Sequence, residues 1–239
     1  MEKTIGFSTG AVYQFADSLS EKTIKLFDQM GCTAIEINWH KNTDILNKEL
    51  NIFLSDCSFE KITMHLPSNI KYSDNFATFN LLLHAFYNFP CIYYFLFHPD
   101  LIEDWRILRK VKLQGVQLTI ENMDNRKKSF RTLDSLNTAF LNHPNFGLVF
   151  DVNHWIVNGN SIESIQPTIQ TLTQNNIRIC GIHLSGTDFH QPLFKSNGGK
   201  DIIKSLSIVP NHIPIIIESI LKNEEELKKE WDFINKHLT

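Results

Sequence analysis

Short apolar runs of β-type sequence recur along this chain at intervals of roughly thirty residues, and most of them end in a histidine or a carboxylate. Those that end this way are Ile-Thr-Met-His65, Tyr-Phe-Leu-Phe-His98, Gln-Leu-Thr-Ile-Glu121, Gly-Leu-Val-Phe-Asp151, Gly-Ile-His183 and Pro-Ile-Ile-Ile-Glu218. Two weaker runs, Thr-Ile-Gly-Phe7 and Ala-Ile-Glu36-Ile-Asn38, bring the number to eight. A parallel strand is buried on both faces and therefore reads as a continuous apolar run, while the residue after it emerges at the end of the sheet. The pattern predicts eight parallel strands whose polar ends converge.

Segments with helical periodicity separate these runs. Ser18 or Ser20 can cap a helix that buries Ile24 and Phe27 and ends before Gly31. Further helices are expected at 42–50, 76–86, 101–111, 133–141, 162–172 and 224–237, with a short one at 198–206. Alternation of strand and helix predicts an α/β fold, a single (β/α)₈ TIM barrel over residues 1–239. The length of 239 residues is close to that of such barrels, typically about 250 residues.

Composition agrees with one large soluble domain. The chain is 42% hydrophobic and has no Gly-, Pro- or Ser-rich linker, no signal-peptide pattern and no apolar run long enough to span a membrane. Its four cysteines are widely spaced, form no Cys-x-x-Cys pair and read as buried thiols. We therefore expect a cytoplasmic protein with no membrane partner.

The strand-end residues also predict a metal site. Four consecutive strands end in Glu121, Asp151, His183 and Glu218, which would surround one point on the barrel axis. Carboxylate and imidazole ligands together suit zinc, manganese or iron. Three carboxylates in one pocket would repel one another, and a bound dication is the simplest way to neutralise them.

These residues resemble the ligands of the xylose-isomerase-like TIM-barrel superfamily, and most closely those of endonuclease IV. The resemblance runs from the first strand to the last, and includes Pro99 after His98, Asn122 after Glu121 and the Asp-x-x-His spacing of Asp151 and His154. It implies a first metal bound by His65, His98 and Glu121, and a second bound by Glu121, Asp151, His183 and Glu218. It implies a third bound by His154, Asp188 and His190. The implied cofactor is zinc, up to three ions, with manganese or iron as alternatives.

The same resemblance implies a phosphodiester hydrolase that acts on abasic DNA or a related phosphoester. Glu121 and Glu218 would be the catalytic residues, with Glu218 orienting the nucleophile. The side chains expected at the substrate rim are Trp39, Tyr72, Arg126 and Lys195. A formal net charge of -3 does not exclude DNA, because bound dications would place positive charge in the cleft.

Other functions fit the same residues. A sugar or sugar-phosphate isomerase or epimerase would need only one metal at Glu121, Asp151, His183 and Glu218, with the glutamates moving a proton at carbon. A multinuclear iron oxidase and a non-catalytic metabolite-binding barrel are further alternatives. Asp188 follows His183 by only five positions, which is closer than in endonuclease IV, so Asp188 could instead hydrogen-bond to His183 or His154 without binding metal.

Overall fold

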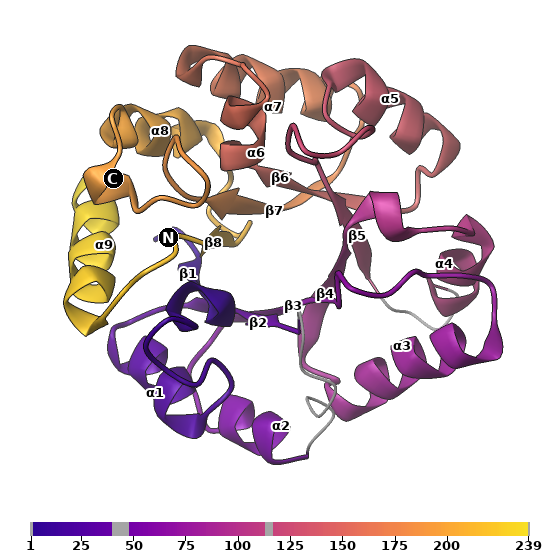
Figure 1. Ribbon diagram of the computed structural model, residues 1–239, viewed down its shortest axis with the longest axis horizontal. Coiled ribbons are helices and arrows are strands. Elements are labelled where there is room, and N and C mark those ends of the chain that lie inside the picture. The colour runs from indigo at the N-terminus through magenta and orange to yellow at the C-terminus, as the bar shows by residue number, and fades with distance from the viewer. Residues whose placement is uncertain (1, 40–47, 113–116, 239) are drawn as a thin grey trace.

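The computed structural model describes residues 2–39, 48–112 and 117–238. Eight strands form a closed parallel barrel in the order β1 to β8, and β1 pairs with both β2 and β8. The strands are β1 (Ile5–Ser8), β2 (Ala34–Asn38), β3 (Lys61–His65), β4 (Ile92–Phe97), β5 (Leu118–Glu121), β6 (Gly147–Asp151), β7 (Ile179–Leu184) and β8 (Ile215–Ile217). Figure 1 looks along the barrel, with the strands at the centre and the helices in a ring outside them. The single TIM barrel predicted from the sequence is confirmed.

The outer ring consists of helices that follow the strands. They are α1 (Glu21–Gln29), α2 (Lys48–Ser55), α3 (Phe76–Asn88), α4 (Trp105–Lys112), α5 (Leu133–Asn142), α6 (Val152–Val157), α7 (Ile165–Gln174), α8 (Gly199–Ser205) and α9 (Glu224–His237). Short 3₁₀ turns lie at η1 (Thr9–Val12), η3 (Pro99–Leu101), η4 (Ile162–Ser164), η5 (Leu193–Lys195) and η6 (Leu206–Ile208). The side chain of Ser20 caps α1 by accepting from the Thr23 amide, as Asn223 does for α9 at Glu226.

The apolar runs form strands because both of their faces are covered. Outward-facing side chains such as Phe7 and Phe150 pack under the helices and are fully buried. Inside the barrel one close approach requires glycine: a Cβ at Gly181 on β7 would lie 2.3 Å from the hydroxyl of Tyr94 on β4. The interior is therefore a filled core that supports the rim where the strands end.

The described elements lie close to their predicted positions, with local differences. Helix α4 starts at Trp105, later than the expected residue 101, because Pro99–Leu101 forms the separate turn η3. The start of the helix expected at 42–50 lies outside the described residues, which resume with α2 at Lys48. His98 and Glu218 follow β4 and β8 by one residue and do not belong to them.

No described helix is both long and apolar enough to cross a bilayer. All four cysteines are free thiols, and Cys32 and Cys180 are buried. The prediction of buried thiols is wrong for Cys91, which is exposed where the chain enters β4.

Candidate metal centre and active-site cavity

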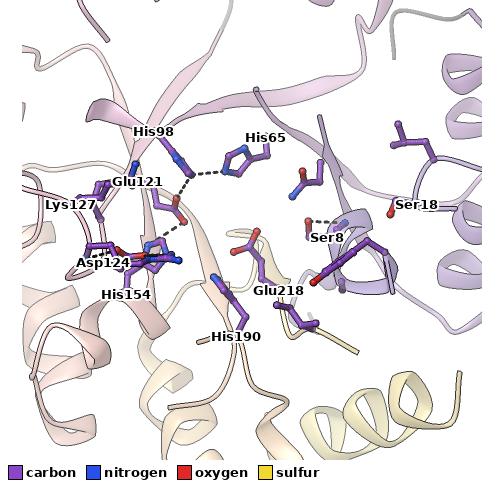
Figure 2. Close-up of a pocket in the computed structure, with 18 of the residues that line it drawn as sticks. Ser8, Ser18, His65, His98, Glu121, Asp124, Lys127, His154, His190 and Glu218 are labelled. Carbon is purple, nitrogen blue, oxygen red and sulfur yellow. Dashed lines mark hydrogen bonds and ion pairs between the residues drawn. The ribbon is translucent and has the colours of Figure 1, made fainter. Parts of the chain in front are cut away.

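The strand-end side chains converge on a cavity of about 670 Å³ at one end of the barrel. Figure 2 shows His65, His98, Glu121 and Glu218 pointing into the same space, with Ser8 on the far side. Its wall is completed by the segment after β1, which contributes Tyr13, Ala16, Asp17, Ser18 and Leu19. This volume is in the range of small-molecule sites, roughly 300–1,000 Å³.

One group of possible metal ligands consists of Glu121, Asp151, His183 and Glu218, whose ligand atoms all lie within 4.8 Å of one another. The Nδ1 atom of His183 is 2.8 Å from Glu121 Oε1 and 3.1 Å from Glu218 Oε2. Asp151 and His183 are paired in register between β6 and β7, which brings their side chains to the same level. Of the four, only Glu121 and Glu218 line the cavity.

A second group consists of His65, His98 and Glu121, with ligand atoms within the same 4.8 Å limit. The Nε2 atom of His98 lies 3.1 Å from Nε2 of His65 and 3.4 Å from Oε2 of Glu121. Because Glu121 faces His183 with Oε1 and His98 with Oε2, its carboxylate lies between the two groups. This is the bridging position that the resemblance implied for it.

Burial and mutual charge shift the pKa values of these side chains. Burial raises the pKa of Asp151 to about 6. Burial alone would also raise the pKa of Glu218, but the nearby His183 lowers it to about 2. Burial would lower the pKa of His183, yet the carboxylates of Glu218, Glu36 and Glu121 raise it well above its ordinary value. The four side chains therefore influence one another's charge, and three of them, Glu121, Asp151 and His183, are almost completely buried.

The residues present fit a divalent cation. The Oδ2 atom of Asp151 is buried and has no hydrogen-bond partner among the described residues. A buried carboxylate oxygen without a partner is costly unless a cation or a donor approaches it. Three carboxylates and one imidazole supply the oxygen and nitrogen donors that zinc and manganese bind.

The third predicted set, His154, Asp188 and His190, is not assembled among the described residues. His154 and His190 do line the cavity, with ring centroids 5.7 Å apart. Asp188 is exposed, does not line the cavity, and accepts a hydrogen bond from the Phe189 amide at 3.0 Å. The Nε2 atom of His154 instead lies 3.8 Å from Oδ2 of Asp124.

Two of the four predicted rim residues belong to the core. Trp39 and Tyr72 are buried, and the Tyr72 hydroxyl donates to the Pro67 carbonyl at 2.7 Å. Neither residue lines the cavity, so the structure does not place Trp39 and Tyr72 at the rim expected from the sequence.

The two basic rim residues also differ from each other. Arg126 lines the cavity, is ion-paired with Asp124 and stacks over the exposed ring of Phe189 at 5.2 Å. Lys195 does not line the cavity and pairs with Glu226 on α9.

Sequence reasoning missed Glu36 and Asp124. Glu36 is fully buried on β2 with its Oε2 3.1 Å from His183 Nε2. A carboxylate in the middle of an otherwise apolar strand is the signal that could have identified it. Asp124 lies three residues after Glu121, in the segment that follows β5.

No family model matches the chain, and no curated protein is similar to it in sequence. Solved structures are similar in fold. D-Psicose 3-epimerase from Clostridium cellulolyticum H10 has a TM-score of 0.66 and 14% identity, over 98% of this chain and 99% of that one. 3-Keto-D-glucoside 4-epimerase from E. coli has a TM-score of 0.71 and 12% identity over 98% of each chain. AsfvAP:AG has a TM-score of 0.74 and 15% identity over 100% of each. This chain therefore has the same (β/α)₈ barrel fold as these structures.

Proposed function

We propose that this protein is a metal-dependent sugar isomerase or epimerase that binds one catalytic cation at Glu121, Asp151, His183 and Glu218. The proposal rests on the observation that Glu121 and Glu218 are the two members of this group that also line the cavity. Two carboxylates at one site can move a proton on and off a substrate carbon. The similar structures that are named as sugar epimerases support this function over the abasic-DNA hydrolase expected first.

The protein's own groups account for binding and proton transfer. A bound divalent cation would polarise the substrate carbonyl and order an adjacent hydroxyl. Glu218, whose pKa His183 lowers to about 2 against the effect of burial, is ionised and lines the cavity, where its carboxylate can accept a proton from the carbon beside the carbonyl and return it to the substrate. Burial would raise the pKa of Glu121, but His154 and His183 lower it well below the ordinary value, so that Glu121 is also ionised. Ser8 and Asn38 line the cavity and supply polar contacts for sugar hydroxyls.

Deuterium exchange tests this function directly. Metal-loaded protein in D₂O should incorporate deuterium beside the carbonyl of a ketose, detected by NMR across a panel of free and phosphorylated ketoses. Glu121→Gln and Glu218→Gln should each lose exchange by roughly a hundredfold or more. Glu226→Gln, outside the cavity, serves as the control. Metal-loaded wild type that exchanges no ketose in the panel would contradict the proposal.

One observation favours a second function, the phosphodiester hydrolase. The group formed by His65, His98 and Glu121 offers a second cation site that a one-metal isomerase does not require. Two cations that share a carboxylate suit the displacement of an alkoxide from phosphorus. Cleavage of an abasic-site oligonucleotide, with two metals per chain and no ketose exchange, would place this function first. Dioxygen consumption by iron-loaded protein would instead favour the iron-oxidase alternative.

A further inference from the structure

The buried carboxylate of Glu36 contacts the ligand His183 from the side opposite the cavity. Glu36 and His183 are both fully buried, and Glu36 Oε2 lies 3.1 Å from His183 Nε2. The other ring nitrogen, Nδ1, faces Glu121 and Glu218. His183 is therefore held between a group of possible metal ligands on one side and a single carboxylate on the other.

We infer that Glu36 is the positioning residue of the metal centre, which fixes His183 in the tautomer and orientation that bind the cation through Nδ1. This inference rests on the cation site of the proposed function. A neutral imidazole carries one proton, so Nδ1 has a free lone pair only when Nε2 holds the proton. A carboxylate that accepts from Nε2–H favours this tautomer and makes Nδ1 a stronger donor to a metal.

The contacts of Glu36 identify it as the acceptor in this pair. The Thr63 hydroxyl donates to the same Oε2 atom at 3.3 Å, so two donors converge on it. The other oxygen, Oε1, is buried and has no hydrogen-bond partner among the described residues. Such a group costs stability, and a role in the metal site is a physical reason for its presence.

The topology shows that this contact is not a by-product of strand pairing. Glu36 belongs to β2, which pairs with β1 and β3, whereas His183 belongs to β7, which pairs with β6 and β8. The two side chains meet across the barrel interior. No backbone register brings them together, so the contact depends on the side chains themselves.

Metal affinity separates positioning from simple packing. Glu36→Leu keeps most of the side-chain volume and removes the acceptor, and we expect it to weaken cation binding by roughly 10- to 100-fold. Glu36→Gln keeps a carbonyl acceptor and should lose less than Glu36→Leu. Thr63→Val, which removes the other donor to Oε2 but no contact of His183, is the matched control and should change affinity by less than about threefold.

The stability of the metal-free protein gives the second readout. In the metal-free protein Glu36 pairs with the buried His183, and removing one partner of a buried pair is destabilising, so Glu36→Leu should unfold at a lower temperature than the wild type. Metal affinity is therefore compared at a temperature at which both proteins are fully folded, where a residue that only packs would leave the affinity unchanged. Wild-type metal affinity in Glu36→Leu would overturn the inference.

A spectroscopic test does not depend on any variant folding. In the zinc-loaded wild type, ¹⁵N NMR of the His183 ring should show coordination through Nδ1 and a proton on Nε2. Coordination through Nε2 would overturn the inference even if the protein proved to be an isomerase. The wild type could show the expected His183 spectrum, and the Glu36 variants the expected metal affinities, while no ketose exchanges deuterium. That result would overturn the proposed function and leave the role of Glu36 standing. A wild type that binds no divalent cation would overturn both.

Discussion

The Nε2 atoms of His65 and His98 face each other at 3.1 Å inside the cavity. The Nδ1 atom of His65 lies 2.9 Å from the Leu66 carbonyl, to which it can donate, which leaves a lone pair on its Nε2. Burial and the neighbouring His65 lower the pKa of His98 to about 3, so its ring is neutral near pH 7. Two imidazole nitrogens that meet beside a carboxylate can share either one proton or one cation.

The shared-cation alternative predicts two metals per chain. His65→Ala and His98→Ala should then each lower the metal content by one ion and leave the four-ligand site loaded. Elemental analysis of protein purified without chelator or affinity metal measures this ratio. One metal per chain in the wild type, unchanged in both variants, would show that the two rings share a proton instead.

We expect Asp188→Ala to bind as much metal as the wild type. Its side chain is exposed and does not line the cavity, so its removal takes no donor from either ligand group. Elemental analysis on the same preparations gives the comparison, with Asp151→Ala as the positive control because Asp151 belongs to the four-ligand group. Loss of one ion in Asp188→Ala would restore the third site expected from the sequence.

Asp151 should make the stability of chelator-treated protein depend on pH. Burial raises its pKa from 3.8 to about 6, so the folded protein binds this proton more tightly than the unfolded chain does. Relative to Asp151→Asn, the wild type should therefore be most stable below pH 4 and lose up to about 3 kcal/mol as the pH rises through 6. Urea unfolding of both proteins at several pH values measures the difference. A difference that does not change between pH 4 and pH 7 would contradict the prediction.

Added cation should reverse this trend, because a metal binds the ionised carboxylate. A divalent cation at a hundred times its dissociation constant would stabilise the wild type by about 2.7 kcal/mol. Asp151→Asn should gain less, since it lacks one negative ligand.

Glu230 on α9 anchors the segment after β7 from outside the cavity. Its carboxylate accepts from the Leu193 amide at 2.8 Å, the Phe194 amide at 3.2 Å and the Ser219 hydroxyl. Glu230→Ala leaves these donors without a partner and should lower the free energy of unfolding by several kcal/mol, at roughly 1–3 kcal/mol for each buried donor.

Glu230→Gln is the matched control, because its amide oxygen still accepts from one or two of the donors and its loss should be smaller. Denaturant unfolding measures both variants. Equal stability of Glu230→Ala and the wild type would show that water replaces the carboxylate.

The barrel and most residues of its two candidate ligand groups could be predicted from the sequence because strand ends are marked locally. His65, Glu121 and Asp151 are the last residues of apolar strands, and the barrel geometry then brings them together. Glu36 could not be placed in the same way. Its partner His183 lies 147 positions away on a strand that does not pair with β2, and a single strand does not reveal which distant residue it faces.

The positions of two expected rim residues and of Asp188 depend on features that the sequence does not record. Trp39 directly follows β2 and Tyr72 lies in the segment after β3, but their large rings pack into the core and the Tyr72 hydroxyl finds a backbone acceptor there. Asp188 lies in a loop whose path turns at His190, which has φ of 52°. The direction of a loop side chain depends on such turns, and spacing along the sequence does not record them.

The backbone at His190 has a further consequence. Residues other than glycine are uncommon at positive φ, and the left-handed conformation costs a side chain roughly 1–2 kcal/mol. Glycine would suit this turn better, yet an imidazole lies here beside His154 in the wall of the cavity. A screen for heat tolerance alone would therefore be expected to enrich His190→Gly, whereas a screen for turnover should select against it. Comparison of the two screens would measure how far selection has kept this imidazole at the expense of thermal stability.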